Sequence, residues 1–479
     1  MNWLNYYRAF RLVRQSRFAE AISLDKKGSY VNSSWAYYRL GMYRSAQQVT
    51  TKSTDFNTLF AKSVSLVNIG NRSEAEVYLT KIKKKYKSQA SLLIQPLATY
   101  FPEYALDLAH QYNKRDSGLY IGLCAQIEGR FAAQQQLKCL KIEAKQPDFK
   151  LLHANFCIED NLEKLAVLNT YLAEFGLSPV SLKHTAKALS VYNLDAHIPH
   201  QKSKAAPLVS IIIPAYNIAD RIASCVQSLL AQDYPYLEII VVDDASTDGT
   251  ATVIQQLSQM YANVHYVQLP VNMGPFVAKT VGTYMAKGEF ITTQDSDDWA
   301  HPQRISKQVL PLLKDKNLVA TTCQWVRLGD CGHFYARQLY PYTRLNPSSP
   351  MFRKTAVQQK IGLWDLARLA GDTEFLTRLK LVFGHKRVLS LKIPLVIGAH
   401  RENSLMTSDS TGHKEDRVSA IRLDYWEAWG HWHINQLRHG TTPKIPQIAQ
   451  YQPQFAIPSV MLNSEEKLEV IKQFILSNF

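Results

Sequence analysis

The sequence predicts a two-part fold, in which a helical-hairpin repeat domain precedes an α/β domain built on a mainly parallel sheet. The first half of the chain repeats a glycine-centred helical pattern, whereas the second half alternates buried apolar runs with amphipathic segments. Alternating strands and helices at this spacing are typical of a right-handed parallel sheet. We expect the helical-repeat domain over residues 1–200, the α/β domain over 207–410 and a C-terminal helical extension over 411–479.

Composition describes an ordinary globular protein. Of the 479 residues, 46% are hydrophobic and 20% are charged, and no run reaches the ~20 apolar residues of a membrane-spanning helix. The N-terminus has no apolar core of a secretion signal, so we expect a cytoplasmic protein, either free or peripheral at the inner face of the membrane. The six cysteines form no CxxC pair, and reduced thiols are expected.

Positive charge is concentrated in the first half of the chain. Residues 1–204 hold 28 basic and 16 acidic side chains, within a net charge of +15 for the whole chain. This excess suits an anionic membrane surface or an acidic polymer, or is only a solvated basic face. No nucleic-acid-binding motif accompanies it, so nucleic acid is not expected as a partner. The lysine run at 81–87 and the aromatic face of residues 3–13 each predict either membrane contact or ordinary helix packing and solvation.

A local pattern recurs in the helical half. Gly41, Gly70 and Gly129 each stand between two helical segments, and Tyr100 to Ala105 occupies the place of the unit between the last two. A tight turn between helices every ~30 residues is the signature of a helical-hairpin array. The region resembles a degenerate tetratricopeptide-type solenoid, which implies a protein partner; the alternative is a spacer without one.

The second half reads as strands and helices in turn. The periodicity fades over 189–206, which predicts a linker. Four β-branched or apolar runs then predict strands at Val209–Ile213, Leu237–Val242, Val264–Gln268 and Phe290–Thr293. Helices are expected between them, over residues 219–232, up to Met260 and over 275–286.

Polar clusters follow three of these strands. They are Pro214–Asn217, Asp243–Asp244 and Asp295–Asp298. Ligands of parallel sheets bind beyond the carboxyl ends of the strands, so these clusters should converge on one rim. No GxGxxG follows the first strand, which argues against a dinucleotide cofactor.

The acidic cluster carries three carboxylates in four positions, Asp295, Asp297 and Asp298. Carboxylates this close repel one another unless a cation lies among them. A hard divalent ion, Mg²⁺ or Mn²⁺, with nucleotide phosphates completing its coordination, is one interpretation. An acidic turn with helix-capping aspartates is the other.

Two longer motifs accompany the acidic cluster. Residues 209–217 read Val-Ser-Ile-Ile-Ile-Pro-Ala-Tyr-Asn, and residues 241–250 read Val-Val-Asp-Asp-Ala-Ser-Thr-Asp-Gly-Thr. With the cluster as a DXD motif, this order resembles the family 2 glycosyltransferases of GT-A fold, over about residues 207–410. The resemblance implies a Rossmann-like sheet, an inverting reaction and a nucleotide-sugar donor, UDP-linked.

The resemblance also implies roles for single residues. Asp297 would hold the metal on the diphosphate, and His400 would be a further metal ligand, where the alternative is a structural histidine. Lys279 would lie near the nucleotide, unless it is a plain surface lysine. Other contacts with the acceptor or substrate would come from Asp298, Trp299 and Arg378. The expected nucleotide-sugar-binding residues are Pro214, Ala215, Tyr216, Asn217, Asp243, Asp244, Ser246, Asn272, Gly274, Lys279, Asp295 and Ser296.

A catalytic base is also required, because an acceptor hydroxyl must lose its proton as it attacks the anomeric carbon. Asp372 and Arg378, at the start of an amphipathic helix, are similar to the family's base segment, with Gly371 where a Glu is frequent. Asp372 is therefore the expected base and Glu374 the alternative, although either carboxylate could only cap the helix. Aromatic and arginine side chains at 325–344 suit an acceptor site, or else core and surface packing.

We predict a metal-dependent inverting glycosyltransferase that transfers a sugar to a glycan acceptor. Its place in bacterial surface polysaccharide synthesis, such as capsule or lipopolysaccharide, follows from the resemblance alone. Two other functions stay open. A sugar nucleotidyltransferase should carry a glycine-rich loop after its first strand, which Pro214–Asn217 is not. A non-catalytic scaffold would bind a partner through the helical array and keep a vestigial sheet domain.

Overall fold

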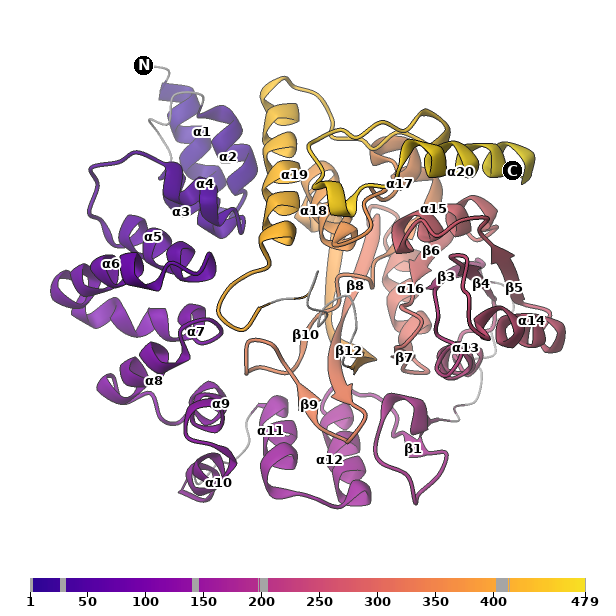
Figure 1. The fold of residues 1–479 in the computed structure, drawn as a ribbon, viewed down its shortest axis with the longest axis horizontal. Coiled ribbons are helices and arrows are strands. Elements are labelled where there is room, and N and C mark those ends of the chain that lie inside the picture. The colour runs from indigo at the N-terminus through magenta and orange to yellow at the C-terminus, as the bar shows by residue number, and fades with distance from the viewer. Residues whose placement is uncertain are drawn as a thin grey trace.

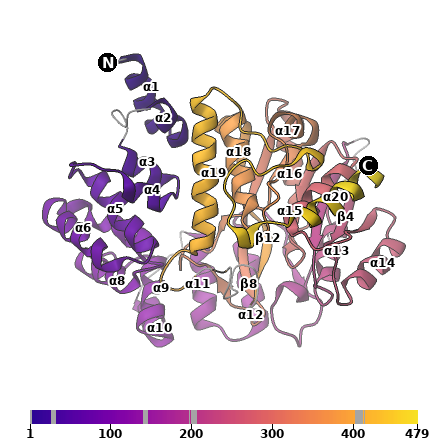
Figure 2. The ribbon, with the colours of Figure 1, turned by 45° about the horizontal axis from the view of Figure 1, so that its top comes forward.

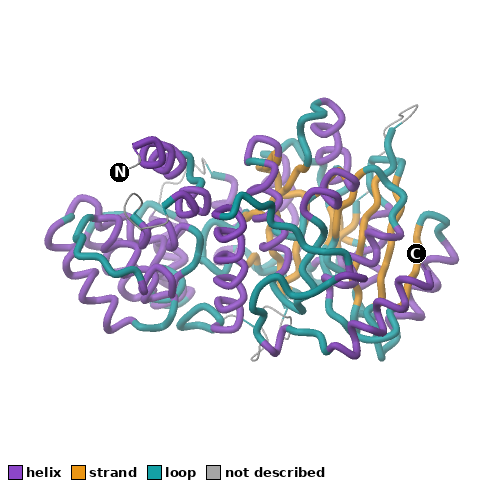
Figure 3. Tube along the Cα trace, turned by 90° about the horizontal axis from the view of Figure 1, so that it is seen from above, coloured by secondary structure: helices purple, strands orange, loops and turns teal. Residues whose placement is uncertain are grey.

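The computed structural model describes residues 3–25, 32–139, 146–196, 198, 206–401, 412 and 414–478. An arc of helices occupies one side of the molecule and a mixed sheet flanked by helices the other (Figure 1). Seen from above, the strands lie together in the half of the molecule away from the N-terminus (Figure 3). None of the described helices is long and apolar enough to cross a membrane.

Up to residue 173, all regular secondary structure among the described residues is helical. Short strands β1 (Ser181–Leu182) and β2 (Leu194–Asp195) then pair with each other ahead of the main sheet. The helices are α1 (Trp3–Arg14), α2 (Phe18–Leu24), α3 (Ser33–Arg39), α4 (Tyr43–Gln48), α5 (Phe56–Asn68), α6 (Arg72–Lys85), α7 (Ile94–Leu97), α8 (Pro102–Gln111), α9 (Gly118–Ile127), α10 (Arg130–Cys139), α11 (Pro147–Cys157) and α12 (Asn161–Ala173).

Glycine turns join the helices in pairs. Gly41, Gly70 and Gly129 adopt φ angles of +74°, +89° and +93°, in turns that lead from α3 to α4, α5 to α6 and α9 to α10. Backbone in this region is costly for residues with a Cβ, which explains why glycine recurs there. The unit without glycine turns instead at Phe101, and Pro102 opens α8. The predicted helical hairpins are confirmed, and the likeness to tetratricopeptide repeats stays a prediction.

The main sheet has the strand order β5-β4-β3-β6-β11-β8-β12-β7. Its first four strands are parallel, and they match the four runs expected from the sequence within two residues. The shared register places β3 between β4 and β6, so the three polar clusters leave neighbouring strands. The strands are β3 (Val209–Ala215), β4 (Leu237–Asp243), β5 (Val264–Gln268), β6 (Phe290–Thr293), β7 (Trp299–Ala300), β8 (Ala320–Gly329), β9 (Phe334–Tyr335), β10 (Arg344–Leu345), β11 (Met351–Arg353) and β12 (Val388–His400).

Helices cover both faces of the sheet, because alternate strand residues point to opposite sides. Ile211, Ile213 and Val241 face one core, whereas Ile212 and Ile240 face the other. The first core is completed by α13 (Ile222–Leu230), α14 (Thr250–Met260) and α16 (Arg304–Lys314). The second is completed by α15 (Pro275–Met285), α17 (Lys354–Ile361), α18 (Gly371–Phe383) and the C-terminal α20 (Glu465–Asn478). This layered α/β architecture with a preceding helical region is consistent with a GT-A catalytic domain.

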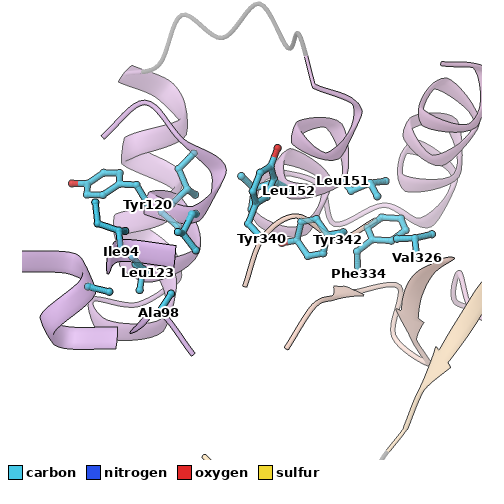
Figure 4. Close-up of a cluster of buried hydrophobic side chains, with 14 of the residues drawn as sticks. Ile94, Ala98, Tyr120, Leu123, Leu151, Leu152, Val326, Phe334, Tyr340 and Tyr342 are labelled. Carbon is cyan, nitrogen blue, oxygen red and sulfur yellow. The ribbon is translucent and has the colours of Figure 1, made fainter. Parts of the chain in front are cut away.

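The helical array and the sheet domain share one hydrophobic core. Figure 4 shows Tyr340 and Tyr342 beside Leu152 of α11, with Phe334 and Val326 of the sheet next to them. The aromatic segment at 325–344, interpreted from the sequence as suited to an acceptor site, therefore packs in large part against the array. This segment forms the joint between the two parts.

The C-terminal extension lies across the same joint. In Figures 1 and 2, α19 (Ala420–Arg438) stands between the array and the sheet domain. The indole of Trp426 donates to the carbonyl of Leu40 at 2.7 Å, and Glu427 accepts the backbone N–H of Arg44 at 2.6 Å. Because the extension is packed on both parts, the division at residues 200 and 411 stays a prediction.

Asn155 of α11 makes polar contacts across this joint, and its substitution should destabilise the protein. Its side chain exchanges two 2.8 Å hydrogen bonds with the backbone of Phe334 and donates to the Tyr342 hydroxyl at 3.1 Å, while only 2% exposed. Asn155→Ala leaves a buried N–H and C=O unpaired, so we expect a loss of about 2–3 kcal/mol in unfolding free energy, measured by urea denaturation. Asn57→Ala, at an exposed position in the first turn of α5, is the matched control. Equal midpoints for the two variants would contradict the anchoring role.

Candidate active site

The first two polar clusters meet at the rim of the sheet. The backbone N–H of Asn217 donates to the Ser246 hydroxyl at 3.0 Å, and the backbone N–H of Thr247 donates to the Asn217 side chain at 2.8 Å. Asn217 and Ala245 both adopt positive φ, at 47° and 58°. Next to Asn217, Tyr216 is 49% exposed, so an aromatic face is available at the rim. Pro214 and Ala215, by contrast, are buried within β3.

Asp244 connects the second cluster to the loop that precedes α15. Its carboxylate accepts the backbone N–H groups of Met273 and Gly274, each at 2.7 Å, and the side-chain amide of Asn272 at 2.9 Å. Burial raises the pKa of Asp244 to about 6, against the lowering effect of those N–H donors. Asp243, wholly buried, accepts the backbone N–H of Ser246 at 3.0 Å. Both carboxylates therefore shape the rim.

A cation that sequence reasoning missed holds the other side of this loop. Arg368 donates to both oxygens of Asn272 and, at 3.1 Å, to the side chain of Asn463. Gly274 has φ +91°, and a Cβ there would lie 3.2 Å from the Cα of Arg368. This close approach explains the glycine. A single arginine in a loop gave only a weak signal in the sequence.

The ammonium of Lys279 pairs with two carboxylates: that of Asp295, the first aspartate of the acidic cluster, and that of Asp372, the expected base. This ammonium lies 2.9 Å from each oxygen of Asp372, 3.4 Å from Asp295 and 3.0 Å from the hydroxyl of Ser348. Only 1% of the lysine is exposed, so it is not the surface lysine of the alternative interpretation. Although burial by itself would lower the pKa of Lys279, the two carboxylates raise it above its ordinary value. Ser348 was not expected from the sequence.

The Asp372 carboxylate is held from a second side. The indole N–H of Trp364 donates to its Oδ1 at 3.1 Å, and the Trp364 ring stacks on Phe375 with centroids 4.6 Å apart. Burial raises the pKa of Asp372, and Lys279 opposes that rise. The side chain keeps 19% of its surface exposed, so the carboxylate is oriented yet reachable. These are properties of a positioned base.

The rest of the acidic cluster divides between the surface and the interior. Asp297 is 20% exposed and accepts the Arg401 guanidinium at 2.9 Å. Asp298 is 4% exposed, accepts the backbone N–H of Ala399 at 2.8 Å, and burial raises its pKa well above the ordinary value. Ser296, between Asp295 and Asp297 in the chain, is partly exposed.

His400 ends β12 next to the residues that bind Asp297 and Asp298. Its ring stacks on Tyr335 at 3.5 Å, and burial lowers its pKa to about 4, which keeps the imidazole neutral. Among the described residues, its buried Nδ1 has no hydrogen-bond partner. A neutral imidazole with an unused nitrogen and an accessible carboxylate fit a divalent metal chemically. Within the described part of the chain, however, no three such side chains form a cluster, and residues 402–411 lie outside it.

The alternative base and the three expected acceptor or substrate contacts require correction. Glu374 and Arg378 are wholly buried as a bidentate ion pair, with bonds of 2.7 and 2.8 Å, and His433 adds a 3.0 Å contact to Glu374. Asp298 is buried as described above, and Trp299 is 2% exposed in the core shared with the array. Side chains buried this deeply offer almost no surface to an acceptor. The structure therefore gives no support to Glu374 as a base or to the other three as acceptor contacts.

Comparison with known proteins identifies the segment that carries most of these residues. A family model described as "Glycosyl transferase family 2" matches residues 210–365. This segment is a family 2 glycosyltransferase domain. It contains the rim, the acidic cluster, Lys279 and Trp364, and it ends ahead of Asp372.

Relatives of the glycosyltransferase domain are similar over short lengths. TuaG of Bacillus subtilis (strain 168), named for teichuronic acid biosynthesis, is 41% identical over 103 residues, which are 22% of this chain and 41% of that protein. A hyaluronan synthase of Pasteurella multocida is 40% identical over 124 residues, 26% of this chain and 12% of that protein. The chain thus spans less than half the length of these relatives. The S. aureus TarS 1–349 structure in complex with UDP-GlcNAc covers 56% of this chain and 71% of its own, with 19% identity and a TM-score of 0.37, too low to equate the folds.

The buried Glu374 should contribute to stability in a pH-dependent way. Burial alone would raise its pKa, but Arg378 and His433 outweigh it and lower the pKa to about 2, from an ordinary 4.5. A lowered folded-state pKa gives stability that is present above about pH 4.5 and lost as the pH falls towards 2; a shift of this size corresponds to about 3 kcal/mol. At pH 7, Glu374→Gln should therefore have its unfolding midpoint at a lower urea concentration than the unmodified chain. The difference between the two midpoints should shrink as the pH falls towards 2. Glu466→Gln, on the surface, should behave as the unmodified chain.

Proposed function

We propose that this protein is an inverting glycosyltransferase that transfers a sugar from a nucleotide-diphospho-sugar, UDP-linked, to a hydroxyl of a glycan acceptor. One observation carries the proposal. The carboxylate that follows β6, Asp295, and the carboxylate at the start of α18, Asp372, meet at one buried lysine. The donor rim and the expected base thus belong to a single centre, as a transfer between two bound substrates requires.

Asp372 is the proposed base. Its carboxylate faces two fixed donors, Lys279 and Trp364, which hold it in one orientation while part of it stays accessible. An acceptor hydroxyl hydrogen-bonded there would lose its proton to Asp372 as its oxygen attacks the anomeric carbon from the side opposite the diphosphate. Lys279 stabilises the ionised form of the base before the proton arrives.

Tyr216, Asn217, Ser246 and the loop at 272–274 are the proposed donor-binding rim. Tyr216 offers an exposed ring, and Asp244 holds the loop through backbone N–H groups. In this proposal Asp243 and Asp244 act chiefly by shaping the rim, since both are almost fully buried. Asp295 and Ser296 border the sugar end.

A divalent ion, Mn²⁺ or Mg²⁺, would be held by Asp297 and His400 together with the donor's diphosphate. When bound, it would neutralise the charge that develops on the leaving diphosphate. The chain would orient the two ligands through Arg401, which pairs with Asp297, and through Tyr335, which fixes the imidazole plane. A carboxylate and an imidazole together suit Mn²⁺, which accepts both oxygen and nitrogen ligands.

The acceptor is proposed to be a growing bacterial surface polysaccharide. Relatives named for teichuronic acid, hyaluronan and succinoglycan support a polysaccharide. The excess of basic side chains in the helical half suits an acidic polymer, a protein partner with an acidic face or an anionic membrane surface.

Two substitutions test the reaction directly. With Mn²⁺, an acceptor extract and a panel of nucleotide-sugars, the unmodified chain should release nucleoside diphosphate from one donor. Asp372→Asn removes the base and should lower kcat by about 10²–10⁴-fold, and Asp297→Ala should abolish the metal-dependent rate. Asp116→Asn, at an exposed site in the array, is the control and should be fully active. No turnover of any donor by the unmodified chain would favour the scaffold interpretation.

Lys279 should set the acid limb of the pH profile. Because its charge lowers the pKa of Asp372, Lys279→Met should raise that pKa and move the acid limb of kcat/KM upward, by roughly one to three pH units. Lys279→Arg keeps the charge and should shift the limb far less. If Lys279→Met lowers kcat/KM equally at every pH and leaves the acid limb in place, the result would contradict this role and indicate a purely structural lysine.

A further inference from the structure

The C-terminal helix α20 packs beside the proposed donor rim. Both Figure 1 and Figure 2 show it next to α15, the helix that follows the loop at 272–274. Ile471 and Ile475 of α20 are buried in the same core as Leu269, which precedes that loop, and Met273, which lies within it. Since the family model ends at residue 365, this helix lies outside the matched domain.

Polar contacts join the start of this C-terminal segment to the rim loop. The side-chain amide of Asn463 donates to the carbonyls of Met273 at 2.9 Å and Leu366 at 3.0 Å. Lys467 donates to the carbonyl of Asn272 at 3.1 Å. Arg368 donates to both Asn272 and Asn463, so it joins the loop to the C-terminal segment. The position of the loop depends on the C-terminal segment.

One cavity opens where α20 meets the rim. It encloses about 320 Å³ and is lined by Ala245, Ser246, Gln268, Leu269, Pro270 and Phe474. Ala245 and Ser246 follow β4, residues 269–270 follow β5, and Phe474 comes from α20. The volume falls in the ~300–1,000 Å³ range of small-molecule sites.

The chemistry of this cavity suits an aromatic base rather than a phosphate. None of its lining side chains is charged, and two are polar amide or hydroxyl groups that can pair with the edge of a base. Phe474 is half-buried and packs against the second core, and it also forms part of the cavity wall. Stacking of a base on such a ring is favourable for any base.

We propose that α20 completes the donor site, with Phe474 forming the wall on which the donor's nucleobase stacks. The inference rests on the proposed function, since it assigns the base of the same nucleotide-sugar to this cavity. The diphosphate would then extend from the cavity past Ser246 towards Asp295. Asn463 and Lys467 are positioning residues that hold the loop between them.

Binding of free nucleotide to the full chain tests this without turnover. Calorimetry with Mn²⁺ identifies which of UDP, GDP and ADP the unmodified chain binds most tightly, and inorganic pyrophosphate is titrated in parallel. Phe474→Leu keeps an apolar side chain in the core but removes the ring, so it should weaken the nucleoside diphosphate about tenfold and leave pyrophosphate unchanged. Phe474→Tyr, which restores a ring, should bind nearly as the unmodified chain does.

Leu476→Ala is the matched control, because Leu476 lies on the same helix and is 75% exposed. It should bind nucleotide as the unmodified chain does. Unchanged nucleotide affinity in Phe474→Leu, or an equal loss for nucleotide and pyrophosphate, would overturn the assignment while the proposed function stands. If the unmodified chain binds none of the three nucleotides, the proposed function fails and this inference fails with it.

Discussion

The buried ammonium of Lys279 is the charge on which the centre depends. A cation with 1% exposure is tolerated only where carboxylates compensate it, and here they come from β6 and α18, which are far apart in the chain. The requirement to neutralise one lysine therefore couples the packing of α18 to the end of the sheet. It also brings Asp372 to the acidic cluster with its carboxylate already oriented by Trp364. Local charge balance and the orientation of the proposed base are here the same constraint.

The helical array is not an independent appendage. Tyr340, Tyr342 and Phe334 enter its core, and α19 is bonded to the turn at Leu40. A shared apolar core of this kind resists relative motion more than a polar contact would. The array is thereby held in a defined place relative to the sheet domain.

The proposed donor rim is shaped by carboxylates that are themselves buried. Asp243 accepts the backbone N–H of Ser246, and Asp244 accepts those of Met273 and Gly274. The loop at 272–274 is therefore held in shape by Asp244. Charge-assisted bonds to backbone donors are strong and directional. The exposed groups, chiefly Tyr216 and the cavity beside Phe474, are then presented on a rigid frame.

The sequence by itself determined the strands, the glycine turns and the order of motifs, because β-branched runs, positive-φ glycines and strand-end clusters are local signals. The sequence also predicted Asp295, Asp297 and Asp372 as functional residues. Only the tertiary structure decided that Glu374 and Arg378 form a buried pair, that the aromatic segment at 325–344 packs on the array, and that Arg368 and α20 border the rim. Those outcomes depend on which distant elements meet, since burial and ion pairing are properties of the packed chain rather than of any segment within it.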